Sequence, residues 1–280
     1  MKLNSVYNEI SDLFKSVCES HNFEAKELIK YVCGINETEF LLRRNDEISD
    51  EHKQRIFNLS EKRLSGVPLQ YLIGEWDFMG RTFKVGEGVL IPRPETELLC
   101  QYVIEALKEK SAPCVFDLCA GSGCISVSIK LGTKNADVYA VEKSPEAFGY
   151  LKANAENLCS DTPITLINGD IFNIDDFRNL PKADVVVSNP PYINSDDIAF
   201  LQKEVRHEPR MALDGGVDGL DFYRFIICEW KHLLKDDGFF AFECGEEQAD
   251  KISNILKENG FDSFIFKDYN NIYRFVVGRR

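Results

Sequence analysis

Strands and helices alternate along the second half of the chain, and this order limits the possible fold more than any other feature. From Cys114 onward, short apolar runs alternate with segments of helical periodicity. That alternation predicts an α/β fold with a mainly parallel sheet and helices on both faces. The expected strands span 114–118, 138–141, 164–167, 184–188, 239–243, 264–266 and 273–277, and the expected helices span 124–131, 145–157, 219–234 and 246–259. The last two strands are separated by a short connection, so one of them must run antiparallel.

The first 70 or so residues show only short amphipathic helices. Helical spacing covers residues 4–20, a second helix ends at Gly34, Asn36 caps a third through Leu42, and Ser49 caps a fourth. Residues 66–74 break the helical periodicity, and alternating apolar residues with glycine turns then favour a β-hairpin. We therefore expect a helical domain over 1–73, a β-hairpin linker over 74–93 and a sheet domain over 94–280. The helical domain is either a packing unit or a module that recognises a macromolecule.

Charge and cysteine content narrow the class of protein. The net charge of −13 over 280 residues disfavours a footprint on duplex phosphates and fits a basic partner, a cationic ligand or a merely solubilising surface. Nine cysteines without a CxxC, and four scattered histidines, predict reduced thiols and no metal site. The N-terminus resembles neither a signal nor a transit peptide, and no apolar run approaches the roughly 18 residues of a membrane span. We expect a cytoplasmic protein without a membrane partner.

A glycine loop follows the first strand of the sheet domain, in the run Phe-Asp-Leu-Cys-Ala-Gly-Ser-Gly-Cys-Ile over 116–125. Gly121 and Gly123 let the backbone approach a ligand closely. Glu142, at the end of the next strand, is placed to accept the two ribose hydroxyls of a nucleoside. The third glycine of a dinucleotide motif is missing, because Ser126 stands there. A ligand without a pyrophosphate, S-adenosyl-L-methionine, fits best, with Asp117 facing its ammonium group.

A second loop, Asn-Gly-Asp-Ile-Phe over 168–172, follows the third strand. It is either an ordinary turn or the adenine site, with Asp170 accepting from the adenine amino group and Ile171 or Phe172 packing on the ring. Its position after Glu142 favours the adenine site. The predicted cofactor-binding set is Asp117, Cys119, Ala120, Gly121, Ser122, Gly123, Glu142, Asp170, Ile171 and Asn189.

A buried strand ends at Asn189-Pro-Pro-Tyr192, since a proline cannot donate to the next rung of a sheet. The Asn189 side-chain oxygen and the Pro190 carbonyl are then two fixed acceptors. An amide nitrogen is a poor nucleophile because its lone pair is delocalised. Two acceptors aimed at its N–H bonds would orient it, and Tyr192 would stack on the planar group near a sulfonium charge. Asn189, Pro190, Pro191 and Tyr192 are the predicted catalytic and substrate-binding residues, acting by positioning and electrostatics.

The tetrapeptide resembles the (D/N/S)PP(Y/F) motif of S-adenosylmethionine-dependent methyltransferases that act on planar nitrogens. Within that class the chain is similar to the PrmC/HemK protein-glutamine methyltransferases. The similarity lies in the segments Gly-Val-Pro-Leu-Gln-Tyr-Leu-Ile-Gly over 66–74, Val-Leu-Ile-Pro-Arg-Pro-Glu-Thr-Glu over 89–97, Asn-Pro-Pro-Tyr-Ile over 189–193, and Glu-Val-Arg-His-Glu-Pro-Arg-Met-Ala-Leu-Asp-Gly-Gly-Val-Asp-Gly-Leu over 204–220. Two departures stand out: Cys119 and Ala120 replace a glycine and a threonine of the family loop, and Glu142 replaces the commoner aspartate. A cysteine cannot take a positive φ without strain, so no such φ is expected at Cys119.

The resemblance implies a Rossmann-like class I methyltransferase sheet behind a helical domain and a hairpin. It implies methylation, without a metal, of the glutamine side-chain amide in the Gly-Gly-Gln loop of class I peptide chain release factors, with S-adenosyl-L-homocysteine as the product and the helical domain gripping the factor. We expect a monomer without direct nucleic-acid contacts. One alternative is a DNA adenine amino-methyltransferase, which must flip its base and which the charge disfavours. Another is a nucleoside-binding module that only docks a translation factor, which the intact Asn189 and Tyr192 disfavour. The role of Arg93, fixed between two prolines, stays open between positioning and helix entry.

Overall fold

A computed structural model describes residues 1–133, 135–268 and 270–280. The chain divides into two compact units. The first contains Met1–Glu75 together with Gln202–His207, and the second contains Trp76–Leu201 together with Glu208–Arg280. A hexapeptide from the later part of the chain therefore packs within the helical unit.

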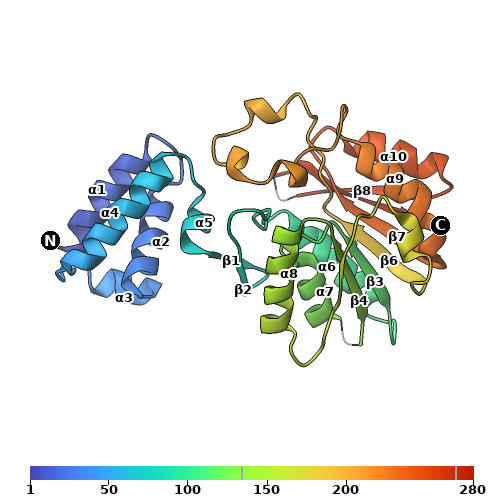
Figure 1. Cartoon of the computed structure of the whole chain (residues 1–280), viewed down its shortest axis with the longest axis horizontal. Coiled ribbons are helices and arrows are strands. Elements are labelled where there is room, and N and C mark those ends of the chain that lie inside the picture. The colour runs from blue at the N-terminus through green and yellow to red at the C-terminus, as the bar shows by residue number, and fades with distance from the viewer. Residues whose placement is uncertain (134, 269) are drawn as a thin grey trace. The chain divides into compact units, whose positions relative to one another are not determined.

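The first unit is built from short helices (Figure 1), namely α1 (Leu3–Phe14), α2 (His21–Cys33), α3 (Glu37–Leu42), α4 (Asp50–Leu64) and α5 (Leu69–Ile73). The predicted caps are confirmed: Asn36 forms a capping box, Ser49 accepts from the backbone of the first turn of α4, and Gly34 ends α2 in the left-handed conformation. Two predictions are corrected. The first helix ends at Phe14, where the Ser16 hydroxyl bonds to the Leu13 carbonyl at 2.9 Å. A helical turn, α5, stands where the periodicity was expected to break.

A buried arginine holds the hexapeptide in the first unit. Arg63 of α4 is only 2% exposed, and its guanidinium pairs with Glu24 of α2, at 2.5 Å, and with Glu204 of the hexapeptide. A buried charge of this kind is tolerated only when it is paired. The segment that follows the Asn-Pro-Pro-Tyr tetrapeptide is thus anchored in the helical unit by Glu204.

The hairpin of β1 (Glu75–Phe78) and β2 (Arg81–Lys84) is followed by a seven-stranded sheet in the order β5-β4-β3-β6-β7-β9-β8. The strands of the sheet are β3 (Cys114–Leu118), β4 (Asp137–Glu142), β5 (Thr165–Asn168), β6 (Ala183–Ser188), β7 (Leu234–Glu243), β8 (Asp262–Lys267) and β9 (Tyr273–Arg279). All seven predicted strands are present. Strand β9 runs antiparallel to both β7 and β8, as the short connection required, and the other pairs are parallel.

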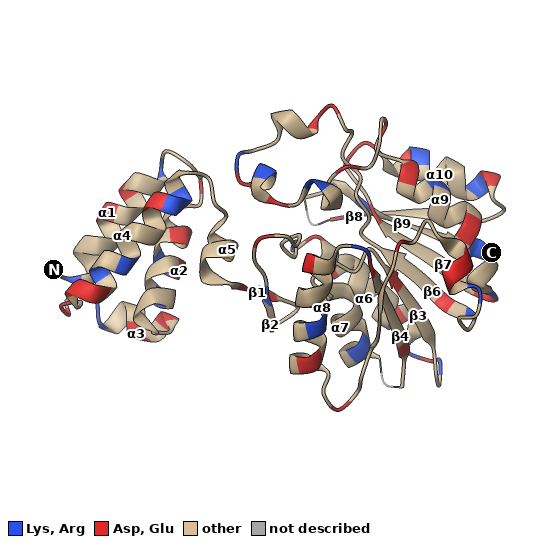
Figure 2. Cartoon of the chain, viewed as in Figure 1, with Lys and Arg blue, Asp and Glu red and all other residues tan. Residues whose placement is uncertain are grey.

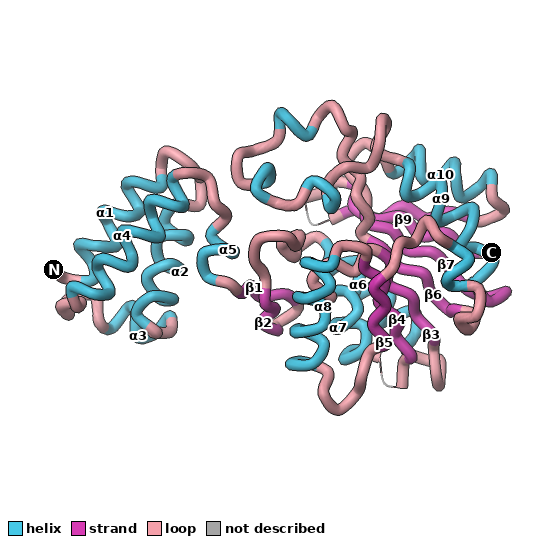
Figure 3. Tube along the Cα trace, viewed as in Figure 1, coloured by secondary structure: helices cyan, strands magenta, loops and turns pink. Residues whose placement is uncertain are grey.

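Helices cover both faces of this sheet (Figure 3), which confirms the predicted α/β class. Residues of α6 (Thr96–Leu107), α7 (Cys124–Gly132) and α8 (Pro145–Leu158) share one apolar core with one side of the strands. The other core contains residues of α9 (Asp221–Glu229), a 3₁₀ turn over Trp230–Leu233 and α10 (Ala249–Glu258). The predicted helix 219–234 is therefore an α-helix with a 3₁₀ ending. Side chains of strand β3 point alternately to the two faces of the sheet and are buried on both, since Val115 belongs to the first core and Phe116 to the second.

The strand order reverses between β3 and β6, which are direct neighbours in the sheet. The chain leaves β3 toward β4 on one side, while β6 lies on the other, so the carboxyl ends of β3 and β6 border a crevice. The Ser188 hydroxyl donates to the Leu118 carbonyl at 2.5 Å and ties the two ends together. This edge of the sheet is where a ligand site is expected.

Acidic and basic residues are interspersed along α8 and α10 (Figure 2). In the described part of the chain, no helix combines the length and apolar character that crossing a bilayer requires.

Candidate active site

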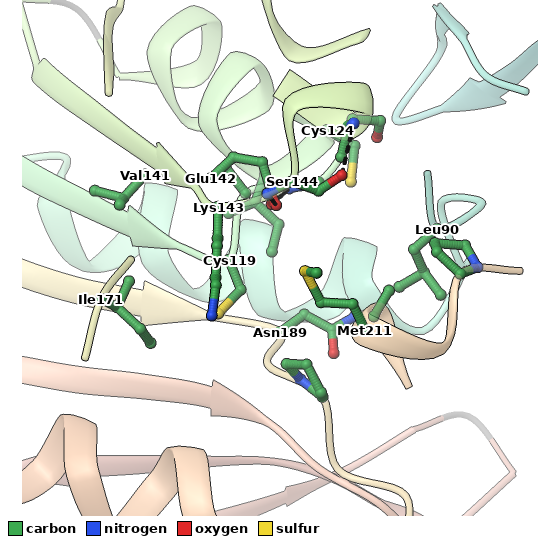
Figure 4. A pocket seen from close by; sticks show the side chains of 18 of the residues that line it. Leu90, Cys119, Cys124, Val141, Glu142, Lys143, Ser144, Ile171, Asn189 and Met211 are labelled. Carbon is green, nitrogen blue, oxygen red and sulfur yellow. Dashed lines mark hydrogen bonds between the residues drawn. The ribbon is translucent and has the colours of Figure 1, made fainter. Parts of the chain in front are cut away.

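A cavity opens at the carboxyl edge of the sheet, within the second unit (Figure 4). Its walls come from the segment that enters α6, from the glycine loop, and from the residues that follow β4, β5 and β6. Segment 209–212 and the start of α9 close one side. The lining includes nine predicted site residues: Cys119, Ala120, Gly121, Ser122, Glu142, Asp170, Ile171, Asn189 and Pro191. One cavity therefore brings together the glycine loop and the strand end that the sequence placed far apart.

The glycine loop turns sharply at the end of β3. Cys119 has a φ of 61°, so the expectation of no positive φ at this position was wrong. The turn lets the next amide, of Ala120, donate to the Val141 carbonyl at 3.0 Å, which ties the loop to β4. A left-handed conformation costs a non-glycine residue about 1–2 kcal/mol, so Cys119 stores strain beside the cavity. At Gly121 a Cβ would meet nothing within 4 Å, so this backbone lies open to a ligand.

Glu142 ends β4, and its carboxylate connects the glycine loop with the residue that precedes α8. One oxygen accepts from the Gly121 amide at 2.8 Å, and the other from the Ser144 amide at 2.7 Å. Burial raises the pKa of this carboxyl, and the backbone donors oppose that rise. Each carboxylate oxygen keeps a further lone pair for a ligand hydroxyl.

Asp170 lies on the same wall, and its carboxylate has a partner that sequence reasoning missed. One oxygen forms an ion pair with Lys143 at 2.8 Å, and the other accepts from the Phe172 amide at 3.1 Å. Ile171 is buried and Phe172 is partly exposed against Phe222 and Phe225, so an apolar surface flanks the carboxylate. Such a wall suits a flat, partly polar ring.

Asn189 follows directly on β6, which ends at Ser188 as predicted. Its Nδ2 donates to the Thr96 hydroxyl over a long 3.4 Å. Its Oδ1 is buried and has no hydrogen-bond partner within the described residues. A buried acceptor without a partner costs about 1–3 kcal/mol, so it points to a donor that arrives with a ligand. In Figure 4 Asn189 lies beside Met211, at the end of the cavity away from Ser144.

Four predicted site residues do not line this cavity: Asp117, Gly123, Pro190 and Tyr192. Asp117 is fully buried beneath the loop, where it accepts from the backbone and hydroxyl of Ser126. Gly123 faces α8, because a Cβ there would come within 2.5 Å of Leu151. Tyr192 packs with the second core, and its carbonyl accepts from Gln248 at 2.8 Å.

Glu208 organises the entry to the cavity and was not among the predicted residues. It is 5% exposed, accepts from the Ile91 amide at 3.0 Å and pairs with Arg93. Arg93, which lines the cavity, is therefore held by Glu208 rather than being a plain helix-entry residue. The Glu-Pro-Arg run over 208–210 lies in a segment that carries the family resemblance, but its pairing with residues 91–93 depends on the fold and has no local signal in the sequence.

Two buried carboxyl groups lie under the site and make stability depend on pH. Burial raises the pKa of Asp117 and of Glu243 to about 7, with hydrogen bonds from Ser126 and Thr96 opposing the rise. Between pH 5 and 7 the native state therefore holds protons that the unfolded chain has lost, so stability falls as pH rises through this window.

We expect the melting temperature to be higher at pH 5.5 than at pH 8, because each unit of raised pKa costs about 1.4 kcal/mol once the group ionises. Asp117→Asn should shrink this difference, and the matched variant of exposed Asp161, Asp161→Asn, should not. Thermal unfolding followed by circular dichroism measures it. Equal melting temperatures for the wild type at the two pH values would contradict the assignment.

No group of three or more potential metal ligands is found among residues 1–133, 135–268 and 270–280. The polar groups of the cavity include the carboxylates of Glu142 and Asp170, the side-chain amide of Asn189 and exposed backbone groups. This set suits hydrogen bonding to an organic ligand.

Two family models and many known proteins resemble this chain. Residues 5–74 match the model of the PrmC N-terminal domain, and residues 95–216 match that of the methyltransferase small domain. The release factor glutamine methyltransferase of Aquifex aeolicus is 34% identical over 279 residues, covering 100% of this chain and 98% of that protein. That of Clostridium acetobutylicum is 36% identical over 282 residues, covering 100% and 96%. Among solved structures, the hMettl16 catalytic domain in complex with MAT2A 3′UTR hairpin 6 has a TM-score of 0.56 at 14% identity, covering 85% of this chain and 95% of that one, a likeness of fold alone.

Proposed function

The chain belongs to the family of release factor glutamine methyltransferases, and we propose that it methylates the side-chain amide nitrogen of the glutamine in the Gly-Gly-Gln motif of class I peptide chain release factors. The methyl donor is S-adenosyl-L-methionine. One observation carries this proposal: the buried Oδ1 of Asn189 has no hydrogen-bond partner among the residues that the structure describes, and it lies at the end of a cavity whose other end is built like a nucleoside site.

The residues of the cavity fit the proposed methyl donor. The open backbone at Gly121 admits a ligand where a side chain would intrude, and Glu142 offers lone pairs to ribose hydroxyls. Asp170 and Ile171 present a carboxylate beside an apolar surface to the adenine ring. Asp117 and Gly123 do not line the cavity and would act indirectly, by holding the glycine loop in place. When bound, the donor supplies a methyl group on a positively charged sulfur.

The tetrapeptide orients the acceptor nitrogen. The Oδ1 of Asn189 and the carbonyl of Pro190 accept the two N–H bonds of the glutamine amide, so the lone pair faces the methyl group. Pro191 lines the cavity and keeps the backbone rigid, whereas Tyr192 does not line it and packs with the second core. Catalysis then rests on positioning and electrostatics, and no covalent intermediate with the protein is needed.

The helical unit, residues 1–73 in the predicted division, is proposed to grip the release factor. Its match to the PrmC N-terminal domain supports this role. The net charge of −13 favours a protein partner over direct binding to nucleic acid. The nine cysteines are all unpaired, which fits the reducing cytoplasm, and we propose a monomer that works without a metal.

Glu142→Ala should weaken binding of S-adenosyl-L-methionine about 10- to 100-fold, because hydrogen bonds to a charged group contribute about 1.5–3 kcal/mol. Glu142→Asp keeps the carboxylate and should lose less. Isothermal titration calorimetry measures both, with Glu109→Ala on the surface as the control. Unchanged affinity in Glu142→Ala would show that Glu142 only braces the loop.

Transfer of labelled methyl groups tests the function directly. The protein is incubated with labelled S-adenosyl-L-methionine and either a purified class I release factor or double-stranded DNA. Label is expected on the release factor and not on DNA. Label on DNA adenine, with none on the release factor, would favour the alternative of a DNA adenine methyltransferase, a class of enzyme that shares the Pro-Pro-Tyr motif.

A further inference from the structure

We propose that Thr96 and Glu243 are positioning residues that fix the orientation of the Asn189 amide, so that its oxygen and not its nitrogen faces the substrate. The inference rests on the proposed function, because only an acceptor oxygen can bind the N–H of a glutamine amide. It adds two residues, far apart in sequence, to the machinery of methyl transfer.

The three side chains form a chain of hydrogen bonds that begins at the cavity lining, to which Thr96 and Asn189 belong, and ends at buried Glu243. Thr96 is the first residue of α6, and its hydroxyl donates to Oε2 of Glu243, the last residue of β7, at 2.5 Å. The Nδ2 of Asn189 reaches the same hydroxyl oxygen at 3.4 Å. Thr96 is 1% exposed and Glu243 4%, so water is kept from these bonds.

The direction of these bonds follows from what each group can donate. An ionised carboxylate can only accept, so the single hydroxyl proton of Thr96 must go to Glu243. The Thr96 oxygen is then left as an acceptor toward Asn189, and only the amide nitrogen of Asn189 can donate to it. With the nitrogen engaged, the Oδ1 of Asn189 points the other way, where it is buried and has no partner in the described part of the chain.

Glu243 is held in place by its own surroundings. The Tyr223 hydroxyl donates to its backbone carbonyl at 2.7 Å. Charged and titratable groups face it from α6 and the segment before it, from α7, α9 and β9, and from the residues that follow β6 and β7. They are Arg93, Glu95, Cys100, Cys124, Tyr192, Tyr223, Cys244 and Arg274. Arg93 and Arg274 favour the ionised form, and burial and Glu95 oppose it.

We call the hydrogen bonds from Asn189 to Thr96 and from Thr96 to Glu243 the relay. Protonation of Glu243 would reverse the direction of both bonds. A neutral carboxyl can donate to Thr96, whose hydroxyl is then free to donate toward Asn189 and to draw the amide oxygen away from the substrate. Methyl transfer should therefore need ionised Glu243, and kcat should fall on the acid side. Burial raises the pKa of Glu243 to about 7, which places this fall in a measurable range.

The test compares Thr96→Val, which removes the hydroxyl at constant shape, with Thr96→Ser, which keeps it. With full-length protein, release factor and S-adenosyl-L-methionine, we expect Thr96→Val to lower kcat about 100-fold and Thr96→Ser to stay within about threefold. Calorimetric affinity for S-adenosyl-L-methionine and the melting temperature serve to confirm that both variants are folded and bind the donor. Equal kcat values for the two variants would overturn the proposal.

The pH profile separates positioning from simple packing. The kcat of the wild type should fall below about pH 7. In Glu243→Gln, whose side chain can still accept from Thr96, kcat should not show this fall on the acid side of the pH profile. An acid limb that persists unchanged in Glu243→Gln would refute the relay. Failure of the proposed function itself looks different, because the wild type would then transfer no methyl group to the release factor at any pH.

Discussion

Asn189→Ala should lower methyl transfer to the release factor about 1000-fold while the affinity for S-adenosyl-L-methionine stays within about tenfold. Removing one preorganised hydrogen-bonding group from an active site typically costs 100- to 1000-fold in kcat. Asn189 also lies at the end of the cavity away from the ribose wall of Glu142 and Ser144. Donor binding should therefore survive, and orientation of the amide nitrogen should not.

Single-turnover kinetics and calorimetry measure the two effects separately. Asn179→Ala serves as the matched control, because Asn179 is exposed and lies away from the cavity lining. If donor affinity collapsed together with activity in Asn189→Ala, Asn189 would be a cofactor ligand or a structural turn residue first.

Gly215→Ala should cost about 100-fold in kcat, although Gly215 does not line the cavity. A Cβ at this position would lie 2.7 Å from Cα of Tyr192 and 2.8 Å from the carbonyl oxygen of Pro191. These are backbone atoms of the tetrapeptide and cannot rotate aside. Gly215 also donates from its amide to the Ile193 carbonyl at 2.8 Å, so it is fixed against this strand end. The added carbon must displace the tetrapeptide, and a shift of about 1 Å at a reacting group can cost 100-fold.

Gly149→Ala is the control for this substitution. Gly149 lies in α8, where a Cβ would meet nothing within 4 Å, so alanine should leave kcat unchanged and raise helix stability by up to about 1 kcal/mol. Initial rates with release factor, together with thermal unfolding of both variants, measure the outcome. Wild-type rates in folded Gly215→Ala would show that the tetrapeptide tolerates displacement.

The strands and caps could be predicted because they depend on neighbours in sequence. Three consecutive valines over 185–187 form the centre of a buried strand that the following prolines must end, and Asn36 and Ser49 carry the side chains that helix starts require. The cofactor wall could be predicted for a related reason. Parallel strands deliver their carboxyl ends to one edge, so Gly121, Glu142 and Asn189 had to meet there.

What could not be predicted depends on contacts between distant segments. Thr96 and Glu243 are 147 residues apart, and no local pattern pairs a helix start with that strand end. Cys119 takes a positive φ because its neighbour must bond to β4, which overrides the local preference against that conformation. Lys143 was missed as the partner of Asp170 because a lysine after a strand is otherwise an ordinary surface residue.

Tandem mass spectrometry of the release factor tests most directly whether the protein methylates the glutamine of the Gly-Gly-Gln motif. The factor is treated with the protein and S-adenosyl-L-methionine, digested, and the peptide with the Gly-Gly-Gln motif is fragmented. We predict a single added methyl group on the side-chain amide of that glutamine, absent without the protein and greatly reduced with Asn189→Ala. A methyl group on another residue, or an unmodified glutamine beside an active wild-type protein, would contradict the proposed function.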